Sequence, residues 1–273
     1  MTEVADIFIK HGDEYLKKNK LLPSTYKAIN AIKVCRTAKL GGHIDECDSC
    51  GHIKISYNSC RNRHCPKCQG LAREKWIEDR TEDLLPIPYF HLVFTIPAEL
   101  NPLVLRNKRL LYSILFKASS KTLSELTKDD KYLGAQIGFL SILHTWGQNL
   151  MHHPHVHSIV TGGGLSLDGN KWCNIRKNFF LPVKVMSSLF RGKFLYYLKK
   201  KYKDGSLKFP GAIQPLGNSS QFQKLIDQLY KKDWVVYCKP PFKSAKNVLK
   251  YLGRYTHRVA ISNSRIVKMS SHK

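Results

Sequence analysis

Cysteine is concentrated in one short stretch of this chain, and that stretch restricts the fold more than any other feature. Six of the eight cysteines in the 273 residues fall between positions 35 and 68. Two CX2C pairs have the spacing of zinc-chelating knuckles, and the interval between the pairs is typical of a structural zinc site. Disulfide bonds would require an oxidising compartment, which nothing in the sequence indicates. We therefore predict one zinc ion held by four thiolates: Cys47, Cys50, Cys65 and Cys68.

Further potential ligands lie beside and between the two pairs. They form a chemically sensible set for a second, interleaved zinc ion: Cys35, His43, Cys60 and His64. In the alternative interpretation, the two cysteines of this set are small buried hydrophobic residues and the two histidines contact DNA or water. The sequence leaves both interpretations open.

The chain carries a large excess of positive charge. Lysine and arginine number 45 against 20 aspartate and glutamate residues, a formal net charge of +25. A field of this sign attracts polyanions, so nucleic acid is the expected partner. The alternatives are a merely basic protein and one that docks on acidic membranes, but no basic amphipathic anchor is evident. Because no apolar run approaches the ~20 residues of a membrane span and the first ten residues do not form a signal peptide, we expect a cytoplasmic protein.

The segment between the two CX2C pairs carries arginines that a bound metal would hold on a fixed loop. Arg61 and Arg63 would point guanidinium groups outward, where their planar forks suit phosphate oxygens or base edges. A helix predicted from about residue 69 to 85 adds Arg73, although charges on a helix are usually only its solvated side. We predict that these three arginines contact DNA.

The order of predicted elements indicates two domains. The small helices and the cysteine region form a zinc-binding domain over 1–85, and the following Pro86-Ile87-Pro88 ends a helix and is typical of a linker. Over 86–273 the sequence has an α+β pattern of strand, helices and strand pair. This pattern predicts helices at about 103–118, 134–150 and 182–202, strands at 89–96, 234–238 and 259–269, and a hairpin turn at Asp168-Gly169.

A histidine-rich segment, residues 153–157, leads into a β-branched and glycine-rich run and is predicted to be a strand. Side chains two apart on a strand share a face, so His155 and His157 project together while Val156 faces the core. Two imidazoles placed in this way can bind one metal ion. His153 continues the same face, but a proline separates it from the pair. The alternative is that these histidines simply occur along a strand and bind no metal.

A predicted helix capped by Ser244 carries two tyrosines, Tyr251 and Tyr255. Their spacing of four places them on one face, with Cβ atoms roughly 6 Å apart. Gly253 between them would let a backbone or a substrate approach closely, at a cost of about 1 kcal/mol relative to alanine. Taken alone, two tyrosines at this spacing are most often aromatic residues of the core or the surface.

Taken together, these features resemble one family, the two-tyrosine HUH transposases of the insertion-sequence-ninety-one (IS91) type. The matching segments span nearly the whole chain: His43 with Cys47 and Cys50, and residues 58–68, 89–97, 144–148, 153–157 and 250–262. The resemblance implies a zinc-binding domain followed, over 86–273, by an HUH endonuclease domain with a central antiparallel sheet flanked by helices. It also implies a bacterial DNA transposase with a rolling-circle-like, single-strand route, associated with the nucleoid when bound to DNA.

The resemblance further implies how the site works. A divalent ion, Mg²⁺ or Mn²⁺, held by the two strand histidines would polarise the scissile phosphate of a single-stranded element end. One helix tyrosine would attack and leave a 5′-phosphotyrosine and a free 3′-hydroxyl, and the second tyrosine would allow a second cut. Two histidines rarely complete such a site, so Gln148 or His91 would supply a third ligand. In the tyrosine segment, Arg254 and Arg258 would contact DNA.

Members of this family continue well beyond the tyrosine helix, whereas this sequence stops at Lys273, so we expect a C-terminally truncated copy. Two other functions stay open. A non-catalytic, zinc-dependent nucleic-acid-binding protein, such as an inactive transposase copy, would bind in a salt-sensitive way and form no covalent product. A zinc hydrolase that uses the histidine pair with water would form no adduct with DNA. The sequence specifies neither the target site, the order in which the tyrosines act, nor the oligomeric state.

Overall fold

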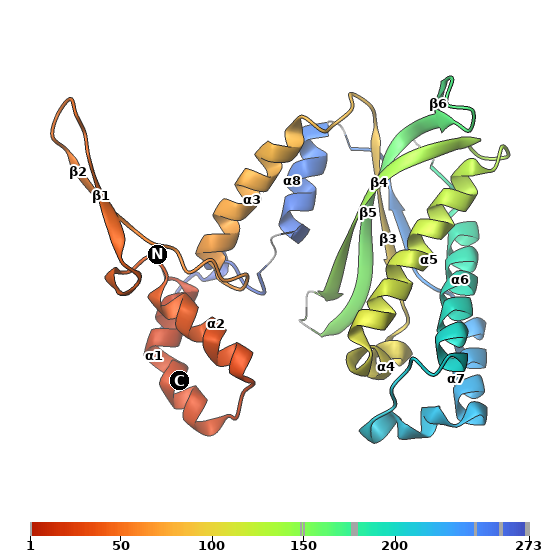
Figure 1. The fold of residues 1–273 in the computed structure, drawn as a ribbon, viewed down its shortest axis with the longest axis horizontal. Coiled ribbons are helices and arrows are strands. Elements are labelled where there is room, and N and C mark those ends of the chain that lie inside the picture. Colours follow the sequence, from red (N-terminus) through yellow and green to blue (C-terminus); the bar gives the residue numbers. More distant parts are fainter. Residues whose placement is uncertain are drawn as a thin grey trace. The chain divides into compact units, whose positions relative to one another are not determined.

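The computed structural model describes residues 2–147, 149, 151–175, 180–242, 245–256 and 259–270 (Figure 1). Internal contacts divide the chain into two units. The first unit joins Met1–Asp83 to Leu249–Lys273, and the second unit is Leu84–Val248. The functional domains expected over 1–85 and 86–273 stay a prediction.

The first unit is mostly helical. Two of its helices begin at prolines, Pro23 and Pro66, because a proline at the first helical position lacks only an N–H that would have no partner within the helix. The helical elements are α1 (Val4–Lys18), α2 (Pro23–Val34), η1 (Ala38–Leu40), α3 (Pro66–Thr81), most of α8 (Ala245–Thr256) and η4 (Asn263–Arg265). Between α2 and α3 lies a two-stranded hairpin of β1 (Gly42–Glu46) and β2 (Ile53–Tyr57), which carries the first CX2C pair at its tip.

The hydrophobic core of the first unit is small and is built around cysteines. Its buried members are Val4, Ala5, Ile32, Cys35, Cys65 and Cys68. The hairpin lies outside this core, because every residue of β1 is exposed and β2 is exposed at all positions except Ser56. A core of this size supplies little free energy of folding, so small domains of this kind depend on a bound metal or a similar cross-link.

The second unit is built on a five-stranded antiparallel sheet in the order β4-β5-β3-β7, with β6 paired to β5 (Figure 1). Its strands are β3 (Tyr89–Thr95), β4 (Ala135–Trp146), β5 (His152–Ser166), β6 (Trp172–Asn174) and β7 (Val236–Lys239). Its helices are η2 (Ala98–Leu100), α4 (Asn101–Arg106), α5 (Lys108–Lys128), α6 (Val183–Lys203), η3 (Gly211–Gly217) and α7 (Ser219–Lys231). The predicted α+β class with a central antiparallel sheet is therefore confirmed. None of the helices in the described part of the chain has the length and apolarity needed to span a bilayer.

The register of the sheet separates an apolar face from a face that bears histidines. Directly opposite residues on paired strands share a face: Phe94 pairs with Val156, whereas Val93 pairs with His157. Phe94 and Val156 are fully buried and belong to the large core of this unit, to which α5 and α6 contribute. The structure thus places His155 and His157 together on the face opposite Val156, as the sequence predicted.

Several predicted elements of the second unit are confirmed with small shifts of their ends. The strand expected at 89–96 is β3, the helix at 182–202 is α6, and the strand at 234–238 is β7. The turn at Asp168-Gly169 joins β5 to β6, and Gly169 has the positive φ of 74° that such a turn requires.

Two predictions of secondary structure are wrong. The segment expected to be a helix over 134–150 forms β4, because its apolar positions fit either period and pairing with β5 decides in favour of the strand. The strand expected over 259–269 is absent from the described residues 259–269, where the chain has only the short helical turn η4. A strand needs a neighbour with which to pair, and no described strand pairs with this segment.

Gly164 lies where the backbones of β5 and β4 are close. A Cβ atom at this position would lie 2.3 Å from the carbonyl oxygen of Gln136, a backbone atom that cannot move without shifting β4. We expect Gly164→Ala to lower the free energy of unfolding of the second unit by about 1–3 kcal/mol, the usual cost of overpacking. Gly138→Ala is the matched control, because its Cβ would meet only the Thr161 methyl carbon at 3.5 Å. Thermal denaturation measures both, and equal melting temperatures would contradict the prediction.

Candidate metal centres

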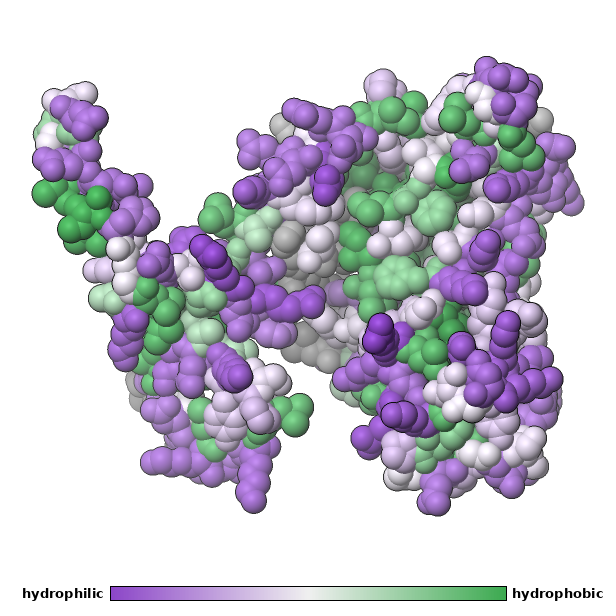
Figure 2. Space-filling model, in the orientation of Figure 1, coloured by the Kyte–Doolittle hydropathy of each residue, from purple (hydrophilic) through white to green (hydrophobic). Residues whose placement is uncertain are grey.

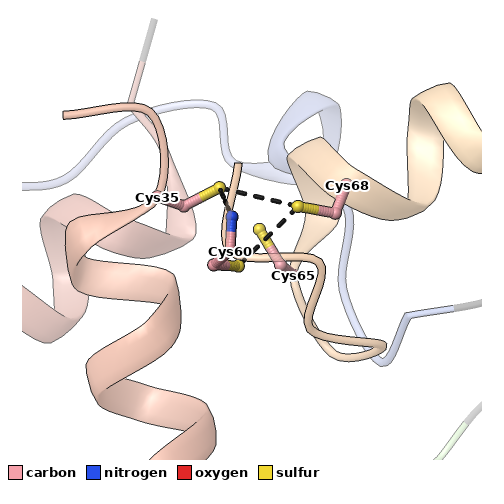
Figure 3. Close-up of side chains that lie close together, drawn as sticks. All are labelled: Cys35, Cys60, Cys65 and Cys68. Atoms are coloured by element: carbon pink, nitrogen blue, oxygen red, sulfur yellow. Dashed lines mark hydrogen bonds between the residues drawn. The ribbon is translucent and has the colours of Figure 1, made fainter. Parts of the chain in front are cut away.

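Four cysteine side chains of the first unit converge on one point (Figure 3). Cys35 follows α2, Cys60 and Cys65 lie on the loop from β2 to α3, and Cys68 is in the first turn of α3. The four sulfur atoms all lie within 4.8 Å of one another. The Sγ atom of Cys68 is 3.6 Å from that of Cys35 and 3.7 Å from that of Cys60. A tetrahedral zinc ion with Zn–S bonds of about 2.3 Å separates its sulfur ligands by about 3.8 Å, so the cluster has the size of a zinc site.

Burial and backbone N–H groups explain why this cluster favours a cation. Cys60 N–H lies 3.5 Å from Cys35 Sγ. Burial raises the pKa of the Cys65 thiol to about 11 and also raises the pKa of Cys60. These two thiols therefore stay protonated at neutral pH unless a positive ion compensates their charge, and a coordinated divalent ion does so. The donor set fits zinc.

The structure combines the predicted zinc ligands differently from the sequence prediction. The second CX2C pair joins Cys35 and Cys60, so the cluster takes one half of each predicted set. Cys47 and Cys50 lie at the exposed tip of the hairpin, where backbone N–H groups of Ser49 and Cys50 hold the pKa of Cys47 below its ordinary value. The two pairs are separated because β1 and β2 carry Cys47 and Cys50 away from α3. The number of residues between the two CX2C pairs does not reveal this separation.

The two histidines of the predicted second zinc set lie outside the cysteine cluster. His43 is on β1, with Nε2 at 3.6 Å from a carboxylate oxygen of Asp45. His64 is exposed on the loop before α3, and its backbone N–H donates to the Asn62 side chain at 2.9 Å. The interleaved second set is therefore not assembled among the residues that the structure describes.

Three histidines of the second unit form another group of potential metal ligands. His155 and His157 come from β5, and His144 comes from β4, where it pairs with His155 in the register. One ring nitrogen of each lies within 4.8 Å of the others, and His144 Nδ1 is 3.2 Å from His155 Nε2. All three side chains are buried. Two adjacent strands thus bring three imidazoles within reach of a single ion.

Neighbouring groups orient two of the three rings. His155 Nδ1 lies 2.6 Å from the carbonyl oxygen of His153; a carbonyl only accepts, so Nδ1 carries the proton and Nε2 presents a lone pair. His157 Nδ1 lies 2.8 Å from His91 Nε2, and the two rings stack at 5.1 Å. Burial lowers the pKa of His91 to about 4, so this ring is neutral at pH 7. Partners of this kind fix the tautomer and orientation of a ligating histidine.

The structure thus puts His144, and not His91, beside the histidine pair as the third potential ligand. His91, considered as a third ligand, lies behind His157, whereas His144 joins the ligand group. Sequence reasoning missed His144 because the segment around it was interpreted as a helix; interpreted as a strand antiparallel to β5, it places His144 beside the histidine pair. Imidazole suits first-row transition metals and Mg²⁺ prefers oxygen, so the group fits an ion such as Mn²⁺ better than Mg²⁺.

Gly253 lets α8 pack closely against α3, which lies beside it in Figure 1. A Cβ atom at Gly253 would lie 2.9 Å from Ile77 Cδ1 and 3.0 Å from Arg73 Cγ. The close approach that the sequence predicted here is therefore made by α3. Tyr251 lies on this packed helix and is half-buried.

The remaining predicted residues are placed as follows. Arg61 and Arg63 are exposed on the loop of the cysteine cluster, and Arg73 Nη2 lies 2.7 Å from a Glu74 carboxylate oxygen. Gln148 and Arg258 lie outside the described residues, and the side chains of Tyr255 and Arg254 are not described.

The mixed α and β fold thus carries two chemically distinct groups of potential metal ligands, the cysteine cluster in one unit and the three histidines in the other. Residues 7–96 match the model of the transposase zinc-binding domain, and residues 138–273 match the model of a putative transposase. The chain belongs to the IS91-type family of transposases.

Individual relatives agree with this assignment. The putative transposase y4qJ of Sinorhizobium fredii (strain NBRC 101917 / NGR234) is 50% identical over 266 residues, which cover 97% of this chain and 67% of that protein. The transposase for insertion sequence element IS801 of Pseudomonas savastanoi pv. phaseolicola is 30% identical over 257 residues, which cover 92% of this chain and 59% of that protein. The chain therefore spans about two thirds or less of the length of these relatives.

Solved structures show a weaker similarity. The metal-bound complex of the conjugative relaxase TrwC with oriT DNA is 11% identical, with a TM-score of 0.34 over 63% of this chain and 71% of that chain. A complex of the same relaxase with mutant oriT DNA is 15% identical, with a TM-score of 0.34 over 67% of this chain and 68% of that chain.

Proposed function

We propose that this chain cuts and rejoins single-stranded DNA at the ends of an insertion sequence by a rolling-circle-like route. The observation that carries the proposal is the group of His144, His155 and His157, found in a member of a transposase family. These imidazoles would hold a divalent metal ion, which would polarise the scissile phosphate and stabilise negative charge in the transition state. His91 and the His153 carbonyl position two of the rings from behind.

Tyr251 and Tyr255 are the proposed nucleophiles. The unperturbed pKa of tyrosine is about 10, so its hydroxyl is a weak nucleophile at pH 7 and needs a phosphate made more reactive. The tyrosine hydroxyl loses its proton and its oxygen bonds to phosphorus, the P–O bond to the 3′-oxygen of the preceding nucleotide breaks and that oxygen takes up a proton, and a 5′-phosphotyrosine remains. Because the ester keeps the energy of the phosphodiester, a free 3′-hydroxyl can attack it and rejoin a strand without ATP.

The cysteine cluster is proposed to hold a structural zinc ion that orders the DNA-contacting part of the first unit. The arginines proposed to contact DNA are Arg61, Arg63, Arg73, Arg254 and Arg258. The net charge of +25 supports a nucleic-acid partner, since it favours long-range attraction to phosphate groups. The protein would act in the bacterial cytoplasm, on the nucleoid.

Replacing His144 tests the histidine group directly. We expect His144→Ala to weaken Mn²⁺ binding, measured by calorimetry, and to lower the rate of strand cleavage by at least about tenfold, because one of three ligand nitrogens is lost. His153→Ala is the matched control: it removes an exposed imidazole from the same strand and keeps the backbone carbonyl that orients His155. Affinity for single-stranded DNA should change little in either variant. Unchanged metal binding in His144→Ala would contradict the proposed centre, and a zinc-dependent DNA-binding protein without cleavage would then be the better function.

A further inference from the structure

A groove of about 780 Å³ lies at the base of the hairpin in the first unit. Three cationic side chains line it, Arg36, Lys54 and Arg61, and none of the described residues that line it is acidic. The rest of its lining includes Tyr57 and Leu71. A groove with this charge attracts an anion, and its aromatic and aliphatic surface offers a flat apolar contact beside the cations.

The two arginines have an unusual backbone conformation in common. Arg36 has φ 57° and Arg61 has φ 51°, and they are the non-glycine residues with positive φ in the described chain. The left-handed region costs free energy for a residue with a Cβ atom, and such residues persist where the surrounding structure holds them, often at functional sites. Both residues with positive φ line the same groove, and the packing of the protein does not by itself require this.

The cysteine cluster fixes both arginines in place. Arg36 directly follows Cys35, and Arg61 directly follows Cys60. The two segments are joined by hydrogen bonds: Arg36 N–H donates to the Asn58 carbonyl oxygen at 3.1 Å, and Cys60 N–H donates to Cys35 Sγ at 3.5 Å. The two arginines of the groove are therefore connected directly to the cysteine cluster through the backbone.

We propose that this groove binds a segment of single-stranded DNA, with phosphates on Arg36, Arg61 and Lys54 and a base stacked on Tyr57. The proposal rests on the proposed function for DNA as the substrate and adds the place where the first unit holds it. Hydrophobic side chains are exposed on the hairpin (Figure 2), and Tyr57 is 44% exposed next to strand residue Ile55 at 58%. An exposed tyrosine ring can stack on a base only if the face of that base is free. Base faces are covered in a duplex and accessible in a single strand.

The test measures DNA binding by the full zinc-loaded chain without added Mg²⁺ or Mn²⁺, so that it is independent of cleavage. Fluorescence anisotropy would follow a labelled mixed-sequence single strand of about 20 nucleotides, the same strand as a duplex, and the same strand with abasic sites. Arg36→Gly and Arg61→Gly remove a guanidinium group while relieving the left-handed backbone, so neither variant loses stability through strain. We expect each to bind the single strand about tenfold more weakly, with a salt slope reduced by about 1. Arg80→Gln, an exposed arginine of the same unit outside the groove, should stay within about twofold.

Tyr57→Leu separates stacking from charge. We expect Tyr57→Leu to bind the normal single strand about tenfold more weakly than the parent does. On the abasic strand the variant and the parent should bind equally well, because only the normal strand supplies bases to stack. Parent-like affinity of both arginine variants for the single strand would overturn the proposal, as would equal losses on single strand and duplex. If the parent binds as expected but forms no covalent product, the groove stands and the proposed cleavage fails.

Discussion

Replacing Cys60 with serine is expected to release zinc and unfold the first unit. Cys60 supplies one of the four sulfur atoms of the cluster, and serine offers no thiolate in its place. Structural zinc contributes about 10–16 kcal/mol to the folding of small domains, whereas the apolar core of this unit is a few side chains around the cysteines. Zinc analysis should show one ion fewer per chain, and circular dichroism should show a loss of helix. The second unit should still melt cooperatively, because its core is formed by residues between Phe90 and Val236 in the sequence and does not include Cys60.

Cys47→Ser is the matched control for this experiment. Cys47 is exposed at the hairpin tip and lies outside the four-sulfur cluster. We expect this variant to keep its helical content and its melting temperature, since neither the core nor the cluster loses a member. The two groupings of cysteines make opposite claims: if zinc instead joins the two CX2C pairs, Cys47→Ser should release that ion and Cys60→Ser should leave it bound.

The cysteine region shows what sequence can say about a metal site. Residue type and density indicated zinc, because few other arrangements account for so many thiols in a short segment. The grouping of the ligands could not be predicted, because it depends on where the hairpin carries the first CX2C pair and on Cys35 at the end of α2. The spacing of cysteines along the chain shows which neighbouring residues can bind the same ion. The tertiary structure determines which of these pairs come together with other ligands.

The histidine group shows the same limit for the sheet. The period of two predicted that His155 and His157 share a face, and the register confirms it. His144 could not be assigned, because the residues around it fit a helix or a strand equally well and only pairing with β5 selects the strand. A cross-strand neighbour is a property of register, which local sequence specifies weakly. Nothing in the residue type of Arg36 and Arg61 signals their positive φ values, and the Arg36 N–H bonds to Asn58, a residue distant in the sequence.

Replacing both helix tyrosines with phenylalanine is expected to abolish covalent attachment to DNA while leaving the protein folded. Phenylalanine keeps the aromatic ring at Tyr251 and Tyr255 and removes only the two hydroxyl groups. If those oxygens are the nucleophiles, the double variant should form no adduct that survives denaturation, whereas the parent should form one with labelled single-stranded element ends and Mn²⁺. DNA affinity and melting temperature should change little, which separates lost chemistry from lost structure.

The single variants assign a role to each hydroxyl. Tyr251→Phe or Tyr255→Phe alone should still allow a first cut, because one nucleophile remains, but strand transfer that needs two sequential cuts should fail or slow markedly. If the tyrosines only pack α8 in place, all three variants should yield adduct at the rate of the parent, because packing depends on the rings and not on the hydroxyls. Adduct from the double variant, confirmed by mapping the labelled residue, would place the nucleophile elsewhere in the chain. Tyr251 is half-buried on a helix that packs against α3 at Gly253, and phenylalanine keeps its ring there while removing the oxygen, so the variant separates the chemistry of the hydroxyl from the place of the ring.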